Sequence, residues 1–525
     1  MHAKVIRGFK RALVVIAVAG LTLLGVRAYD SLRFPPLELW HRYVPTELSV
    51  KALDGGDWDR YLKAEAAIFD GIRAEVTQKL EPDTKVPANR YFEGSPIYPA
   101  KFAQDWNRSY LLEPDGKPVG AAVFLHGLTD TPYSLRHIAK RYRDRGFVTV
   151  APRLPAHGTV PAALTRVEWE DWMAATRLAV REARRRAGPA APLHIVGFSN
   201  GGALALKYAL DALEDKPLAR PDRLVLISPM IGITRFARLA GLAGLPALLP
   251  PFAKASWLAV VPEFNPFKYN SFPVNGGRQS WRLTAALQEQ IARLAREGRF
   301  ADLPPILTFQ SVLDFTVSTP AILTALYAHV PDNGSELVLF DVNRTVKFGP
   351  LLRSASDTAV ARLLPAPPQP FRITVIGNAG PDSAAAVART IEAGATEERV
   401  REIGLIYPPE VFSLSHVAIP FPMNDPLYGM TPDPGAKEQY GVTLGTIAAR
   451  GERNALIVDQ DFLSRMASNP FFPYLLARIE DGIDQPAKRR ERGASAPARP
   501  APVQKPIGAA AKEPPEYVPQ PLADP

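Results

Sequence analysis

Short, mostly apolar runs alternate with longer segments of helical periodicity through the middle of this chain. The runs occupy residues 121–125, 147–151, 192–196, 223–228 and 305–310, and each is flanked on at least one side by Gly, Pro or Asp. Brief apolar runs between turn residues are typical of buried strands. The segments between them carry apolar residues every three or four positions, which favours helices. This alternation predicts an α/β fold, with a mostly parallel central sheet and helices on both faces.

The run at 192–196 leads into a Gly-x-Ser-x-Gly sequence, Gly197-Phe198-Ser199-Asn200-Gly201, and an Ala/Leu-rich helical pattern follows it. A strand that turns into a helix within one residue leaves no room for a Cβ on either side of Ser199. The same turn lifts the serine hydroxyl into the open. We therefore predict that Ser199 is a nucleophile and that Gly197 and Gly201 form its elbow.

The run at 121–125 ends in His126-Gly127-Leu128-Thr129-Asp130. The tetrahedral intermediate of acyl transfer needs two fixed N–H donors for its oxyanion. We predict the backbone N–H groups of Leu128 and Asn200 as these donors. His126 is expected to order the loop through hydrogen bonds, because a base that precedes the serine would break the usual chain order of serine, acid and histidine.

Asp314 follows the run at 305–310, at the carboxyl end of a late strand. A serine hydrolase of this topology places there the acid that orients its histidine, so Asp314 is the predicted acid. Asp332 and Asp341 are its competitors. Asp332 lies in a Pro-Asp-Asn-Gly sequence, for which turn chemistry is a sufficient explanation.

Only His329 and His416 follow Asp314 in the chain. His329 ends a helical pattern and lies too close to Asp314 to come from the next strand-end loop, so we interpret it as a helix C-terminal residue. His416 lies in a loop-like context and is the predicted base. We attribute its long separation from Asp314 to an insertion over residues 343–402, with a strand of its own at 371–376.

Four segments of the chain resemble successive blocks of the α/β-hydrolase fold. They are residues 126–132, 154–159, 169–172 and 197–202. The chain is most similar to the bacterial carboxylesterase, monoacylglycerol-lipase and serine-aminopeptidase branch of that superfamily, over residues 105–235 and less closely over 300–340 and 403–425. The resemblance implies Ser199 as nucleophile, Asp314 as acid, His416 as base and a helical cap above the site. The chain departs from the family between acid and base, where the histidine normally comes much sooner.

The sequence predicts a division of the chain into eight segments. They are an N-terminal signal anchor or signal peptide over residues 1–28, an extension packed on the core over 29–105, the first part of the core over 106–235, a cap or lid over 236–300, the acid strand over 301–342, the insertion over 343–402, the histidine loop and C-terminal helices over 403–485, and a disordered Ala/Pro-rich tail over 486–525. An apolar cap would line a pocket for an acyl chain, although the same side chains would equally serve to pack the cap on its own core. The tail lacks apolar residues that would offset the entropy of ordering.

The first 28 residues have the pattern of charged and apolar residues that is typical of a targeting segment. Four basic side chains precede residue 12, and residues 12–26 carry no charge. This length lies between the roughly 7–15 residues of a signal-peptide core and the roughly 20 of a membrane span. We expect an uncleaved inner-membrane anchor with its basic end in the cytoplasm and the rest periplasmic or otherwise extracytoplasmic. A cleaved signal peptide, cut at Val26-Arg27-Ala28, and a secreted product are the alternative.

Charge and cysteine content narrow the function classes further. The formal net charge is +9, but the basic excess lies largely at the two ends and in residues 184–186, with no interleaved aromatics, so we expect no nucleic-acid partner. The chain has no cysteine, which excludes disulfides, thiolate metal sites and a cysteine nucleophile.

The expected function is hydrolysis of a carboxylic ester, an acylglycerol or another small acyl ester, through a Ser-His-Asp triad and an acyl-enzyme. We expect that this mechanism requires no metal and no organic cofactor. Two alternatives stay open. One is an amidase or peptidase with the same triad, and the other is a membrane-tethered, non-catalytic binding protein of the same fold that uses the 343–402 insertion as a partner surface.

Overall fold

The computed structural model describes residues 2–232, 243–314, 316–345, 359–447, 465 and 467–484. The tail that the sequence predicts to be disordered, residues 486–525, lies outside these residues.

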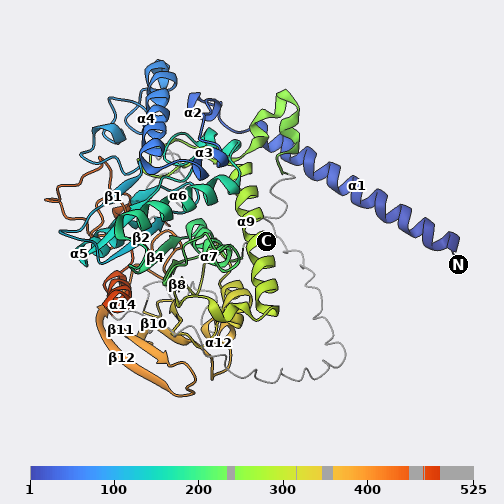
Figure 1. The fold of residues 1–525 in the computed structure, drawn as a ribbon. Helices are drawn as coiled ribbons and strands as arrows, with labels where there is room; N and C mark the ends of the chain where they lie inside the picture. The colour runs from blue at the N-terminus through green and yellow to red at the C-terminus, as the bar shows by residue number, and fades with distance from the viewer. Residues whose placement is uncertain are drawn as a thin grey trace, which may run out of the picture. The chain divides into compact units, whose positions relative to one another are not determined.

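A ten-stranded sheet forms the centre of the fold, in the order β1-β3-β2-β4-β5-β8-β9-β10-β11-β12 (Figure 1). Its first seven strands are β1 (Tyr110–Leu112), β2 (Gly120–Leu125), β3 (Phe147–Ala151), β4 (Leu193–Phe198), β5 (Arg223–Ile227), β8 (Ile306–Ser311) and β9 (Glu336–Phe340). β1 runs antiparallel to β3, and the strands from β3 to β9 are parallel to their neighbours. The carboxyl ends of these parallel strands therefore meet at one edge, where chemistry-bearing loops gather.

Helices cover both faces of the sheet because the strands are apolar on both sides. In β2, Val123 and Leu125 pack into one hydrophobic cluster and Phe124 packs into the other. The first cluster includes α6 (Trp169–Ala187), α7 (Asn200–Glu214) and α9 (Val274–Arg296), and the second includes α5 (Arg136–Asp144) and α14 (Phe472–Asp484). The predicted fold class, a mostly parallel sheet with helices on both faces, is confirmed.

The N-terminal part is helical. It contains α1 (His2–Leu32), α2 (Leu39–Arg42), α3 (Val50–Asp54), α4 (Trp58–Glu75) and the short turns η1 (Thr77–Lys79), η2 (Pro82–Thr84) and η3 (Pro99–Lys101). α4 begins after Asp57, whose side chain accepts a hydrogen bond from the N–H of Arg60 at 2.8 Å, and it buries Trp58 and Tyr61 against the core. Residues Lys10–Leu32 of α1 form the one helix in the described chain that is long and apolar enough to cross a membrane.

The segment that the sequence predicts as an insertion widens the central sheet. β10 (Arg372–Gly380) pairs in parallel with β9, and β11 (Ser383–Ile391) and β12 (Glu398–Ile406) follow as an antiparallel ladder at the edge (orange in Figure 1). Ile373 and Ile376 join the two opposite hydrophobic clusters, so β10 continues both faces of the core. The predicted strand at 371–376 is thus the start of a longer core strand.

The region between β5 and β8 contains residues 236–300, which the sequence predicts to be a cap. Its described elements are η7 (Leu245–Leu248), η8 (Pro250–Ser256), β6 (Trp257–Ala259), β7 (Phe272–Pro273), α9 and η9 (Arg299–Asp302). The remaining short elements are η4 (Pro132–Leu135), η5 (Pro161–Thr165), α10 (Thr319–Ala321), the π-turn η10 (Ile322–Leu326), η11 (Tyr327–His329), α12 (Ala359–Leu363) and η13 (Leu444–Thr446). α9 packs on α6 and α7, and its Ser280 bonds to Asn200 at the start of α7.

Candidate active site

Ser199 sits in a strained turn between β4 and α7. Its φ is +55° and its ψ is −116°, a conformation that residues other than glycine rarely adopt. The Ser199 N–H donates to the carbonyl of Ile227 at 2.9 Å, and its own carbonyl accepts from the N–H groups of Gly202 and Met230, each at 3.0 Å. The neighbouring strand and the first turn of α7 therefore hold the serine in a conformation it would not take alone.

The glycines of the elbow have no room for a side chain. A Cβ on Gly197 would overlap the carbonyl of Gly201, and a Cβ on Gly201 would overlap the carbonyl of Leu125 at the end of β2. A Cβ on Gly202 would lie 2.8 Å from the Cβ of Pro229. These contacts are with backbone or with a rigid ring, which cannot move aside. A side chain is therefore excluded at all three glycines around Ser199, as the elbow requires.

The loop after β2 lies directly against the serine. A Cβ on Gly127 would be 3.2 Å from the Cβ of Ser199, so Leu128 begins next to the serine side chain. Asn200 is the first residue of α7, where backbone N–H groups have no partner within the helix. Its side-chain oxygen accepts a hydrogen bond from Ser280 of α9 at 3.1 Å. The loop that contains Leu128 and the first residue of α7, Asn200, thus both lie beside Ser199, and α9 contacts Asn200.

His126 is a buried histidine whose ring nitrogens are both engaged. Its Nε2 accepts from the N–H of Leu154 at 3.0 Å, so its Nδ1 carries the proton and donates to the carbonyl of Gly127 at 2.9 Å. Its ring also packs against that of His157, with centroids 5.0 Å apart. Burial and this neighbouring histidine lower the pKa of His126 well below its ordinary value. The residue orders the loop, as its sequence position suggests, and is unsuited to act as a base.

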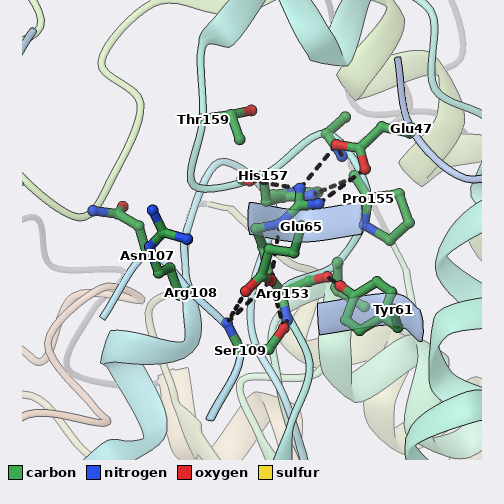
Figure 2. A network of polar contacts seen from close by, with 12 residues as sticks. Glu47, Tyr61, Glu65, Asn107, Arg108, Ser109, Arg153, Pro155, His157 and Thr159 are labelled. Carbon is green, nitrogen blue, oxygen red and sulfur yellow. Dashed lines mark hydrogen bonds and ion pairs between the residues drawn. The ribbon is translucent and has the colours of Figure 1, made fainter. Parts of the chain in front are cut away.

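A buried ion triad ties the N-terminal extension to the core (Figure 2). The guanidinium of Arg153 makes two hydrogen bonds to the carboxylate of Glu47, at 2.8 and 2.9 Å, and one to Glu65 at 3.2 Å. Arg153 is fully buried. Burial raises the pKa of Glu65, although the charge of Arg153 opposes this shift. No motif or periodicity in the sequence marks these three residues as partners.

The triad supports the loop that in turn supports His126. Glu47 also accepts from the N–H of Ala156 at 2.8 Å, and the carbonyl of Arg153 accepts from the hydroxyl of Tyr61. Leu154, which donates to His126, lies between these two fixed points. A continuous set of hydrogen bonds therefore runs from the N-terminal extension to the residue that orders the predicted oxyanion loop.

Asp314 and His416 are in direct contact. Nδ1 of His416 lies 2.8 Å from Oδ2 of Asp314, whose side chain is fully buried. The carboxylate also accepts from Gln310 at 3.0 Å and from the N–H groups of Thr316 and Val317 at 2.8 and 2.9 Å. Burial alone would raise the pKa of Asp314, but the charge of His416 and these hydrogen bonds outweigh it and lower the pKa. Asp314 is thus kept as a carboxylate that can orient the imidazole.

His416 also lies against the elbow. Its ring stacks on that of Phe198, the residue before Ser199, with centroids 5.3 Å apart. Ser199 and His416 are each about 5% exposed. The structure therefore brings together, at the carboxyl edge of the sheet, the serine after β4, the acid after β8 and the histidine of the late loop.

The competing residues lie elsewhere. His329 ends η11 on the surface, with its ring near that of Phe300 at 6.1 Å between centroids, and Asp332 is exposed in the turn that follows. Asp341 follows β9 and pairs with Arg344 at 3.2 Å. Within the part of the chain that the structure describes, no group of three or more His, Cys, Asp or Glu side chains is arranged to hold a metal ion.

The parallel sheet, the strained serine after β4 and the helices on both faces define an α/β-hydrolase fold. The family model described as serine aminopeptidase, S33 matches residues 116–342 of the chain. The chain is also similar to a thermostable monoacylglycerol lipase from Bacillus sp. (strain H-257), with 34% identity over 92 residues. The aligned part is 18% of this chain and 35% of that lipase, so the chain spans about a third of the length of the curated relative it matches.

Several solved structures are similar to part of the chain. One comes from work on LipS and LipT, two metagenome-derived lipolytic enzymes, with 21% identity and a TM-score of 0.37 over 45% of this chain and 88% of that one. Another is Est1E from Butyrivibrio proteoclasticus with bound ferulic acid, with 17% identity and a TM-score of 0.32 over 44% and 84% of the two chains. A third is a soluble variant of monoglyceride lipase from Saccharomyces cerevisiae with a substrate analog, with 13% identity and a TM-score of 0.33 over 44% and 81%.

Proposed function

We propose that this chain is a serine hydrolase that cleaves carboxylic esters, with Ser199 as nucleophile, His416 as base and Asp314 as the orienting acid. The observation that carries the proposal is the 2.8 Å contact between His416 and Asp314 beside the strained Ser199 elbow. A carboxylate that accepts from Nδ1 leaves Nε2 of the imidazole free to take a proton. The match of residues 116–342 to the serine aminopeptidase, S33 family model supports the same assignment.

In the proposed reaction, the Ser199 hydroxyl transfers its proton to Nε2 of His416 as Oγ attacks the ester carbonyl carbon. The N–H groups of Leu128 and Asn200 donate to the oxyanion of the tetrahedral intermediate. The intermediate collapses, His416 protonates the departing alkoxide oxygen, and an acyl-serine is left. Water then loses a proton to His416 and attacks the acyl carbon, which releases the carboxylic acid and restores Ser199.

The ester preference is tested against amide hydrolysis. The similarity to a monoacylglycerol lipase supports acyl esters as substrates. The matching family model is described as serine aminopeptidase, so peptidase activity is the alternative to be tested. We would compare p-nitrophenyl esters of increasing acyl length and a monoacylglycerol with aminoacyl p-nitroanilides, using Ser199→Ala as the control. Turnover of esters that is lost in Ser199→Ala supports the proposal. Turnover of the anilides with inert esters would replace it with a peptidase.

We also propose that α1 anchors the chain in the inner membrane and leaves the hydrolase part on the extracytoplasmic side. The apolar span Lys10–Leu32 and the basic residues before it support this topology. Because the chain has no cysteine, a single Lys117→Cys variant on the exposed turn before β2 reports topology without background. We expect a maleimide that cannot cross the inner membrane to label the cysteine at position 117 in intact cells. Labelling only after lysis would reverse the topology.

A further inference from the structure

The last part of α1 is bound to the cap through one arginine. The guanidinium of Arg27 donates to the carbonyls of Ala243 and Ala255, each at 3.3 Å, and to that of Trp257. These carbonyls lie at the start of the cap segment, at the end of η8 and at the start of β6. Figure 1 shows the green cap segment beside the end of the blue α1. The cap is therefore held at the point where the apolar helix ends.

A second bond joins the same two regions. Nζ of Lys254 in η8 donates to the carbonyl of Phe34, just after α1, at 2.6 Å. The guanidinium of Arg27 also lies over the ring of Phe34, 5.4 Å from its centroid. This cation–π contact lies within the N-terminal segment and helps to hold the guanidinium in place for the cap carbonyls. The link between α1 and the cap thus rests on two cationic side chains, one from each side.

The cap exposes large apolar side chains next to this link. They are Leu245 (42% exposed), Leu248 (81%), Leu249 (59%) and Leu258 (37%). Large apolar side chains along α1 are exposed as well, among them Leu13 (51%), Leu21 (70%) and Val26 (53%). Exposed apolar surface gathered in one segment marks a contact with another apolar body. The cap leucines lie close to the point where Arg27 joins the cap to α1. We therefore expect the same apolar environment to contact the leucines and the apolar side chains of α1.

The length of α1 fixes the depth of this boundary. The span Lys10–Leu32 has 23 residues, or about 34 Å at about 1.5 Å per residue, against about 30 Å for the hydrocarbon core. Counted from Ala12, after the last basic residue, about 20 residues cross this thickness, so the far interface lies near Ser31 and Arg27 lies about 6 Å inside it. An arginine at that depth is stabilised when its donors meet carbonyls, and the cap supplies them. The cap carbonyls that Arg27 contacts are consequently placed at the border between the hydrocarbon core and the lipid headgroups.

We propose that Leu245, Leu248, Leu249 and Leu258 form a membrane-contact surface. This surface inserts into the extracytoplasmic face of the bilayer in which α1 is anchored, and Arg27 holds the cap against α1. The same cap segment continues into α9, where Ser280 bonds to Asn200 at the Ser199 elbow. If the proposed function holds, an acyl ester dissolved in the bilayer would therefore enter the site beneath the cap without crossing water. The membrane contact itself does not depend on catalysis.

The test uses the full chain in phosphatidylcholine/phosphatidylglycerol vesicles. Single-cysteine variants Leu248→Cys and Leu249→Cys carry an environment-sensitive bimane label, with Lys117→Cys as the matched exposed control. Nitroxide groups attached near the lipid headgroups are expected to quench the labels at 248 and 249 several-fold more than the label at 117. Arg27→Ala is expected to remove most of that difference while the chain stays in the membrane fraction. Quenching equal to that at 117 would overturn the proposal, and labels that are shielded from water but not quenched would assign the surface to a second copy of the chain.

A second measurement separates this proposal from the proposed function. The double variant Leu248→Asp/Leu249→Asp is expected to hydrolyse a vesicle-embedded acylglycerol at least about tenfold more slowly, because the transfer of two leucine side chains from water into lipid is worth that much or more. Its turnover of soluble p-nitrophenyl acetate is expected to equal that of the wild type. Equal loss on both substrates would contradict the interfacial role. Lipid quenching without any ester turnover would leave the membrane contact standing and remove the proposed function.

Discussion

Nδ1 of His416 lies 2.8 Å from Oδ2 of Asp314, although 102 residues separate the two in the chain. Between them the chain completes β9, adds β10, β11 and β12 at the sheet edge and returns over the carboxyl ends of the strands. The extra strands extend the sheet away from the elbow. A long addition to the fold is therefore compatible with a short contact between acid and base.

Asp314→Asn is expected to lower kcat for ester hydrolysis by about 10⁴-fold with the fold intact. The carboxylate accepts four hydrogen bonds, from His416, Gln310 and two backbone N–H groups. An amide in its place turns an NH₂ group towards some of these donors and favours the wrong imidazole tautomer. Steady-state kinetics together with circular dichroism check this expectation. A loss below about tenfold would mean that Asp314 does not orient the base.

Gly201→Ala is expected to prevent correct folding or to lower the free energy of unfolding by more than the about 1–3 kcal/mol of ordinary overpacking. The reason is that its Cβ would overlap the Leu125 carbonyl at the end of β2. Gly380→Ala is the matched control, since a Cβ there meets no atom within 4 Å. Urea unfolding of both variants in detergent compares the two positions. Equal stability of the variants would contradict the steric account of the elbow.

Arg153→Met is expected to reduce the free energy of unfolding by about 3–5 kcal/mol, because it leaves the carboxylates of Glu47 and Glu65 without their shared cation. Adding Glu47→Gln and Glu65→Gln to this variant should restore part of the loss. Urea unfolding monitored by tryptophan fluorescence measures both steps. A loss of only about 0.5 kcal/mol, the range of surface substitutions, would show that the triad does not hold the N-terminal extension.

Acid is expected to destabilise the protein through Asp425. This fully buried carboxylate accepts from Arg136 at 2.8 Å and His137 at 2.9 Å. Burial would raise its pKa, but the charge of Arg136 and the bond to His137 lower the pKa far more. A folded-state pKa below the unfolded value of about 3.9 contributes stability above that pH, and the contribution is lost as the pH falls towards the folded value.

The measurement is the urea unfolding free energy of the wild type and of Asp425→Asn from neutral pH down to about pH 3, across the unfolded-state pKa. The wild type should lose stability steeply below about pH 4. The variant should be less stable at neutral pH and should show a shallower decline. Parallel pH curves for the two proteins would assign the acid sensitivity to other carboxylates.

Features whose causes are local could be predicted from the sequence. The strand runs from 121–125 to 305–310 are buried strands because apolar residues between turn residues suffice to specify them. The elbow around Ser199 follows from two glycines beside one serine, and the structure has its strained backbone at that position. Chain order and a loop-like context together favour His416 over His329, and the structure has His416 in contact with Asp314. The catalytic roles of these residues stay a prediction until they are measured.

Features that arise from pairing across the chain could not be predicted. Arg153 and Glu47 are 106 residues apart, and neither lies in a periodic pattern or motif. The run at 371–376 looks like a strand of an inserted unit, because nothing local reveals that β10 pairs with β9. Arg27 looks like part of a cleavage site, since its three carbonyl partners come from a cap more than 200 residues away. Such contacts depend on the assembled sheet and cap.

The most direct test of the account is labelling by a fluorophosphonate probe of the wild type, Ser199→Ala, His416→Ala and His329→Ala in membranes. We expect the wild type and His329→Ala to label equally, Ser199→Ala not to label, and His416→Ala to label at least about 10³-fold more slowly. Labelling that persists in Ser199→Ala, or a folded wild type that does not label, would contradict the central claim that Ser199 is a nucleophile activated by His416.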